Sequence, residues 1–324
     1  MATGKASDMV IYNDQFYSGM TEVAMQNANG FNAASRGGIV LGTQAVLGQY
    51  GYESFVKEIS SFESRQDTTS VSAATDLAAT MDDEISVKRN RKIGPVGQTA
   101  DAWRKIGRDP QHMSFILGQQ AAAAKQLQYL NAAIKAGEGA LTGQSAVKHD
   151  ASDGTLATSD LATGLSKFGD SYNKIVCLVM HGKVYFDLIK NQITENISGV
   201  ASMVVMEATP ATFGLPVVIS DDASLLKTAT TPDTYVTLGL VDGGIRVEED
   251  SEPDDLFFGQ VSGLDSLIYR YQYEYAYNVG IKGFEWDVSN GGANPTDANL
   301  ATSTNWDKVA SDTKSLAGIH ITSQ

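Results

Sequence analysis

Apolar residues recur at steps of three and four over one long stretch of the chain, between Asp109 and Gly137. The residues on this stripe are Met113, Ile116, Leu117, Ala121, Ala124, Leu127, Leu130 and Ile134. Such spacing predicts one amphipathic helix over residues 110–136. Asp109 suits the N-cap, Pro110 suits the first helical position, and Gly137 suits a left-handed residue at the C-terminal end. The helix would be about 40 Å long, which fits a spine along an elongated body.

A second stretch alternates strictly between aromatic and polar residues. Tyrosine occupies every other position from Tyr269 to Tyr277, with Val279 next, and Arg270, Gln272, Glu274 and Asn278 fall between them. This pattern predicts a long antiparallel strand with one buried aromatic face. We expect Tyr271, Tyr273 and Tyr275 to be at least half buried, by contact with Ile116, Leu127 or Leu130 of the long helix or with neighbouring elements. Leu127 should belong to the same core, so that Leu127→Ala would cost about 2–5 kcal/mol.

The region before the long helix contains two further segments. Residues 1–50 are polar and rich in glycine, which predicts an extended arm, or a frayed terminus, without a core of its own. Residues 51–100 contain alternating apolar positions around Phe55 and again around Val87, joined by a polar stretch. We therefore predict a projecting hairpin, which needs a partner to cover it because it has too few large apolar residues to form its own core.

Short apolar strands and helices alternate over residues 150–260, which predicts a mixed α+β domain. We expect a short helix at 159–169, a buried strand at 174–180, a helix from His181, and strands within 202–207, 213–222 and 234–250. A last short apolar strand closes the chain. The fold class is therefore α+β.

Composition narrows the class of protein. The chain has 324 residues, 42% of them hydrophobic, and neither a membrane-spanning apolar run nor a signal peptide, which predicts a soluble protein that functions in a cytoplasm or in something assembled there. The formal net charge of −14 disfavours nucleic-acid binding. Cys177 is the only cysteine and lies in an apolar run, where a buried thiol is expected.

No pattern in the sequence specifies catalysis. The four histidines, His112, His149, His181 and His320, occur singly, without HExxH or CxxC spacing, so we expect neither a metal site nor a cofactor. Asp221 and Asp222 follow an apolar strand, but adjacent side chains on a strand end point apart and commonly cap a turn. We therefore assign no catalytic residue.

Two charged runs of opposite sign are candidates for contact between subunits. The basic cluster consists of Lys88, Arg89, Arg91 and Lys92, and the acidic run consists of Glu248, Glu249, Asp250, Glu252, Asp254 and Asp255. We expect the basic cluster to lie on the projecting hairpin and to dock on acidic surface of an adjacent subunit, with the acidic run as the leading candidate.

The order of these parts, and several motifs along the chain, resemble the major capsid proteins of tailed bacteriophages, which have the Hong Kong 97-type capsid fold. The motifs are DPxxM followed by AxxxxxLxxLNAAI (109–134), KIVCLVMHGKVYFDLIKNQ (174–192), TFGLPVVISDDA (212–223), LGLVDGGIRVEED (238–250) and NPTDANLATSTNW (294–306).

The resemblance implies a domain organisation. Residues 1–50 would be the N-terminal arm and 51–100 the E-loop. Residues 101–149 and 261–324 would form the peripheral domain with its spine helix, and 150–260 the axial domain.

The resemblance also implies a function. The chain would assemble with copies of itself into hexamers and pentamers of an icosahedral shell, in the cytoplasm of the host bacterium, and the shell would enclose DNA without binding it specifically. Its further partners would be a separate scaffolding protein, a portal and a decoration protein.

Two alternatives remain open from the sequence. An encapsulin has the same fold and builds a compartment around cargo enzymes. A hydrolase built on the α+β segment would instead be a monomer with a concave site near Asp221.

Overall fold

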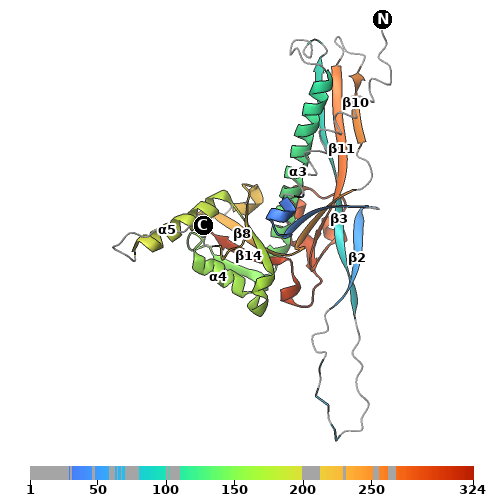
Figure 1. The fold of residues 1–324 in the computed structure, drawn as a ribbon. Coiled ribbons are helices and arrows are strands. Elements are labelled where there is room, and N and C mark those ends of the chain that lie inside the picture. Colours follow the sequence, from blue (N-terminus) through green and yellow to red (C-terminus); the bar gives the residue numbers. More distant parts are fainter. Residues whose placement is uncertain are drawn as a thin grey trace.

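The structure is a computed structural model, and it describes residues 29, 31–45, 48–57, 63, 65–66, 68–69, 80–99, 101, 110–198, 212–228, 231–250, 255–261 and 268–324. These residues form two larger sheets with helices packed on them (Figure 1). The elongated sheet lies beside the long helix α3, and the compact sheet carries α4 and α5. Within this part of the chain no helix has the length and apolar character needed to cross a membrane.

The elongated sheet has the strand order β1-β9-β11-β3-β2, and β10 also pairs with β11. Its strands are β1 (Ile39–Gln44), β2 (Tyr50–Val56), β3 (Met81–Thr99), β9 (Ile245–Asp250), β10 (Asp255–Val261) and β11 (Ile268–Ile281). All neighbours are antiparallel except β1 and β9. The sheet therefore joins segments that lie more than 200 residues apart in the sequence.

The helix α3 (Pro110–Thr142) runs along the elongated sheet (Figure 1). Its start at Pro110 agrees with the prediction, but the predicted end at Gly137 is wrong, because the helix continues to Thr142. A Cβ at Gly137 would lie 2.6 Å from Ile245 Cδ1, and one at Gly139 would clash with the backbone oxygen of Leu300. These glycines therefore allow other segments to pack closely against the helix.

The tyrosine face of β11 is buried, as predicted. Tyr271, Tyr273 and Tyr275 are 4%, 0% and 7% exposed. The ring of Tyr129 from α3 meets Tyr277 edge-on at a centroid distance of 4.8 Å. The core between helix and strand is thus largely aromatic.

The predicted helix face is rotated from the observed one. Leu127 is 58% exposed, so its predicted place in the core is wrong. The buried positions of the helix between residues 121 and 136 are Ala121, Ala122, Lys125, Tyr129, Ala132, Ala133, Ile134 and Ala136, of which Ala121 and Ile134 belong to the predicted stripe. Because the tyrosines of the sheet are large, the helix meets them with mostly small residues, and Leu127 points elsewhere.

The predicted hairpin consists of β2 and the first part of β3, which pair from Tyr50↔Val87 to Val56↔Met81. β3 then continues to Thr99 and pairs with β11, so its second part lies inside the sheet. Much of the tip between the two strands lies outside the described residues, as do residues 1–28 of the predicted arm. The rest of the arm segment includes β1, which pairs with β9.

The compact sheet has the strand order β4-β14-β8-β5-β6, and β7 also pairs with β8. Its strands are β4 (Lys148–Ala151), β5 (Ile175–Met180), β6 (Val217–Ile219), β7 (Leu226–Lys227), β8 (Thr234–Val241) and β14 (Gly318–Ser323), and its helices are α4 (Thr158–Ser166) and α5 (Gly182–Ser198). The predicted buried strand and the helix near His181 are confirmed as β5 and α5. The predicted strand at 202–207 lies outside the described residues.

Smaller elements complete the fold. They are β12 (Phe284–Trp286), β13 (Trp306–Lys308), α6 (Val288–Gly291), α7 (Asp297–Leu300) and the 3-10 turns η1 (Ser145–Val147), η2 (Gly169–Lys174), η3 (Ala223–Leu225), η4 (Ser303–Asn305) and η5 (Thr313–Ser315). Among them, α7, η3, η4 and β13 contact α3. Trp286 and Trp306 meet edge-on at 4.9 Å in the core of this region.

The sheets do not follow the predicted domain boundaries. β9 falls within 150–260 but pairs in the elongated sheet, whereas β14 falls within 261–324 but pairs in the compact sheet. Strand pairing between distant segments decides this membership.

Candidate inter-subunit surfaces

Strand alternation divides the basic cluster between the two faces of the elongated sheet. Arg89 and Arg91 share the face that carries Tyr277 and packs on α3, whereas Lys88 and Lys92 point to the opposite face, which we call the outer face. The cluster therefore does not form one basic patch, although its four members are close in sequence.

On the helix face, a single carboxylate gathers three cations. Arg89, fully buried, and Arg91 both pair with Asp297 of α7. Lys135 Nζ lies 3.2 Å from Asp297 Oδ2 and 3.1 Å from Asp222 Oδ2. We call these five residues the Asp297 network. Its ion pairs connect β3, α3, α7 and the N-cap of η3.

Hydrogen bonds complete the surroundings of Arg89. Its Nε donates to Pro295 O at 3.1 Å and its Nη1 to the Tyr277 hydroxyl at 3.1 Å. Burial alone would lower the pKa of Lys135, but the hydrogen bond and charge of Asp222, together with Asp297, outweigh burial and raise it. Lys135 is therefore held in its charged form, and the network connects segments in the interior of the chain.

The acidic run is divided in the same way. Glu249 pairs on the helix face with Lys125, whose side chain is 3% exposed. On the outer face, Asp250 Oδ2 lies 3.1 Å from Lys88 Nζ within the same chain. Glu252 lies outside the described residues.

These partners change which residues remain available to a neighbouring subunit. Lys88, Arg89, Arg91, Glu249 and Asp250 have ion-pair partners in their own chain. The position of the cluster also differs from the expectation, because it lies within the paired body of β3. A role of the two charged runs between subunits stays a prediction. Lys92 of the basic cluster and Glu248 of the acidic run are the best placed for it, on the outer face.

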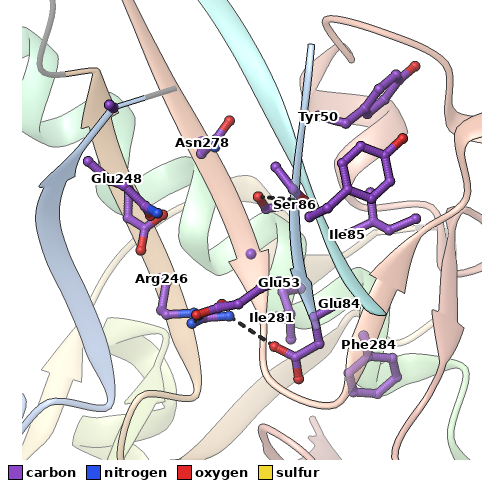
Figure 2. A pocket seen from close by; sticks show the side chains of 15 residues that line it. Tyr50, Glu53, Glu84, Ile85, Ser86, Arg246, Glu248, Asn278, Ile281 and Phe284 are labelled. Atoms are coloured by element: carbon purple, nitrogen blue, oxygen red, sulfur yellow. Dashed lines mark hydrogen bonds and ion pairs between the residues drawn. The ribbon is translucent and has the colours of Figure 1, made fainter. Parts of the chain in front are cut away.

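A cavity of about 310 Å³ opens beside Glu248 (Figure 2). Arg246 extends into it, with Nη1 2.5 Å from Glu53 Oε2 and Nη2 2.9 Å from Glu84 Oε2. Asn278 of β11 also lines it. We call it the acidic cavity, because three glutamates line it against one arginine.

Large apolar side chains are exposed on the β2–β3 ribbon. Tyr52, Val56 and Met81 are 65%, 58% and 76% exposed. A second cavity, of about 490 Å³, lies beside the exposed Tyr172 and Phe213 on the compact sheet's side. Exposed apolar groups gathered in this way mark surfaces that another protein covers.

The residues weighed for catalysis have structural contacts. Asp221 Oδ1 accepts from the Gly182 N–H at 3.2 Å, and Asp222 caps η3 by accepting from Ser224 N at 2.8 Å. This is the capping role expected for the pair. Neither cavity described above is lined by Asp221.

The buried side chains of the compact sheet have structural surroundings as well. His320 is buried beside Thr142, with Nε2 2.9 Å from the hydroxyl oxygen. Cys177 is buried as expected, and burial raises the pKa of its thiol to about 12. In the described ranges, no group of three or more His, Cys, Asp or Glu side chains is spaced to hold a metal ion.

Comparison with known families identifies the class of protein. Residues 8–320 match the model of the Gp13-like family, described as major capsid protein 13-like. The chain belongs to the Gp13-like family of major capsid proteins. It is a shell-forming major capsid protein, as the sequence predicted.

Solved capsids share the fold of this capsid protein. The capsid of cyanophage Pam1 aligns with a TM-score of 0.53 at 8% identity, covering 85% of this chain and 84% of that one. The head of Helicobacter pylori bacteriophage KHP40 aligns with a TM-score of 0.51 at 8% identity, covering 88% of each chain. The Hong Kong 97-type fold predicted from the sequence is thereby confirmed. Among curated protein sequences the chain has no match.

Proposed function

We propose that this capsid protein assembles in the cytoplasm of the host bacterium into hexamers and pentamers of an icosahedral shell that encloses the phage genome. The observation that carries the proposal is the family match over residues 8–320. The exposed apolar side chains of the β2–β3 ribbon support it, because a subunit that works alone has no need of them.

The parts of the chain would divide this work. Residues 1–50 would be the N-terminal arm, and the β2–β3 ribbon within 51–100 the E-loop that covers a neighbouring subunit. The elongated sheet with α3 would form most of the peripheral domain, and the compact sheet most of the axial domain. Tyr52, Val56 and Met81 are the apolar contacts that the ribbon offers to a neighbour.

The overall charge suits a container for DNA. With a formal net charge of −14, the subunit would repel DNA phosphates on average, so packaged DNA would not adhere to the wall. We expect the further partners to be a separate scaffolding protein, a portal and a decoration protein, and we assign the chain no catalytic activity.

Expression of the chain with and without its phage's scaffolding protein tests the proposal. Closed particles in electron micrographs that carry DNA after infection support a genome shell, whereas particles filled with a cargo enzyme would identify an encapsulin-like compartment. A monomer in every condition would contradict the proposal.

A paired substitution tests the ribbon. Tyr52→Ser with Met81→Ser should leave the melting temperature of the isolated subunit unchanged, because both side chains are exposed there, and should reduce particle yield. Tyr52→Phe is the matched control, since it keeps the apolar ring. Normal particles from the double variant would exclude the ribbon as a contact.

A further inference from the structure

We propose that the acidic cavity is a binding site for a basic side chain of a neighbouring copy of this chain, and that Lys92 supplies that side chain. The proposal rests on the proposed function, because it needs copies assembled in a shell. It deepens that function by naming the site and the group that fills it.

The charges in the cavity are not balanced within the chain. Glu53, Glu84 and Glu248 line it against the single cation of Arg246, which leaves a net charge of −2. Arg246 pairs with Glu53 and Glu84, and Glu84 Oε1 also accepts from the Gly283 N–H at 2.6 Å. Glu248 forms no ion pair in the described part of the chain (Figure 2). The side-chain amide of Gln44 lies beside its carboxylate, but this donor is neutral and leaves the charge uncompensated.

An independent observation at the same place points to a ligand. Asn278 is 4% exposed, and its Oδ1 is buried without a hydrogen-bond donor. It lies directly opposite Glu248 in the register of β11 and β9, and it lines the cavity (Figure 2). A buried carbonyl oxygen without a donor is unfavourable. A rotation of the Asn278 amide that brought this oxygen to the cavity would let a bound donor satisfy it.

The chemistry of these groups favours an ammonium or guanidinium ion over a metal ion. The described residues provide no cluster of three acidic, histidine or cysteine side chains spaced for a metal, and Arg246 already lies between two of the three glutamates. A protonated amine carries several N–H donors, which a carboxylate and an amide oxygen can accept together.

The pKa of Glu248 is consistent with a missing cation. Burial raises this pKa, the charge of Arg246 lowers it, and the charge of Glu53 raises it again. A cation placed beside the carboxylate would offset the effects of burial and of Glu53.

Lys92 has the position and freedom to act as the donor. It is exposed on the outer face of the elongated sheet, and in the described residues it forms no ion pair. It pairs in register with Glu274, four residues along β11 from Asn278, or about 13 Å away. This is too far for the side chain to fill the cavity of its own chain, so Lys92 would enter the cavity of a neighbour.

Three variants test the site: Glu248→Gln, Lys92→Gln and the two combined. Each single change should raise the concentration needed for shell assembly about tenfold, because a contact between subunits is lost. The double variant should raise it no further, because both changes remove one contact. Asp307→Asn removes the same charge from another exposed position and should assemble normally.

Subunit stability separates this role from a structural one. Glu248→Gln should leave the melting temperature of the isolated subunit unchanged or higher, because it removes a half-buried charge. A lower melting temperature together with poor assembly would show that Glu248 acts within the subunit, and would overturn the proposal.

The remaining outcomes are equally decisive. Normal assembly of Glu248→Gln would overturn the site while leaving the proposed function intact, and additive effects in the double variant would overturn the choice of Lys92. Assembly of the wild-type chain that requires added spermidine would identify a free amine as the occupant, against a second copy. A density map of the shell should place Lys92 Nζ beside the Glu248 carboxylate of the adjacent subunit. Failure of the wild-type chain to form any shell would contradict the proposed function itself.

Discussion

Asp297 is the position where one substitution should disturb the interior most. Asp297→Asn keeps the shape of the side chain but removes the only carboxylate that pairs with Arg89 among the described residues. Arg89 is 0% exposed and would keep two neutral hydrogen-bond acceptors, Pro295 O and the Tyr277 hydroxyl. Lys135 would still have Asp222. The change therefore leaves the buried guanidinium of Arg89 without an opposing charge.

The burial of Arg89 and Asp297 sets how much free energy of unfolding the substitution should cost. Loss of one partner from a buried ion pair costs about 3–5 kcal/mol. The Asp297 side chain is 40% exposed, so water screens part of the interaction, and we expect Asp297→Asn to lower the free energy of unfolding by about 2–4 kcal/mol. Arg89→Met should cost less, about 1–2 kcal/mol, because Asp297 then keeps Arg91 and Lys135.

Urea unfolding of the isolated subunit, followed by circular dichroism, measures both changes. In the combined variant the two costs should not add, because the charge left unpaired by the first change is removed by the second. Asp307→Asn, an exposed change of the same kind, should stay within about 0.5 kcal/mol of the wild type. If Asp297→Asn is no more destabilising than Asp307→Asn, the Asp297 network does not stabilise the fold, and the reasoning fails.

Three further substitutions test other parts of the interior. Glu249→Gln removes a carboxylate that pairs with Lys125, which is 2% exposed, so the free energy of unfolding should fall by about 1–2 kcal/mol in urea titrations; no change would refute the contribution of this pair. Gly139→Ala should lower the melting temperature by the equivalent of about 1–3 kcal/mol, because the clash with Leu300 O outweighs the better helix propensity of alanine; a more stable variant would show that the backbone yields. Burial lowers the pKa of His320 from 6.5 to about 3, so between these values the unfolded chain binds a proton that the folded chain does not. Stability should therefore fall as the pH drops from 6.5 towards 3, by at most about 1.4 kcal/mol per pH unit from this group, and His320→Gln should reduce that slope.

Local periodicity was sufficient to predict the main elements. The alternation of tyrosines set which face of β11 is buried, since successive side chains of a strand point to opposite faces wherever the strand lies. The start of α3 could be predicted because Pro110 suits the first helical turn regardless of what packs on the helix. The helix end could not, because Gly137 and Gly139 are determined by contacts with Ile245 and Leu300, which are distant in the sequence.

The basic cluster and the acidic run show the same limit of local sequence patterns, because contacts with distant segments decide which of their residues are buried. The sequence contained the signal that Arg89 and Lys88 point to opposite faces, as do Glu249 and Glu248, because a period of two applies to charged residues too. The prediction that each charged run forms a single patch did not take this alternation into account. The sequence of β3 does not tell which face of the sheet α3 covers. Arg89 is buried because α3 packs on the face to which Arg89 points.

The sequence by itself determined the α+β class, the long helix, the tyrosine strand and the order of parts that resembles a phage capsid protein, because these depend on patterns within single segments. Only the tertiary structure decided which sheet β9 and β14 join, which face of α3 is buried, and that Asp297 meets Arg89, Arg91 and Lys135. Asp297 lies more than 160 residues from each of these cations. Contacts of that kind form when distant strands and helices pack together, so no local pattern encodes them.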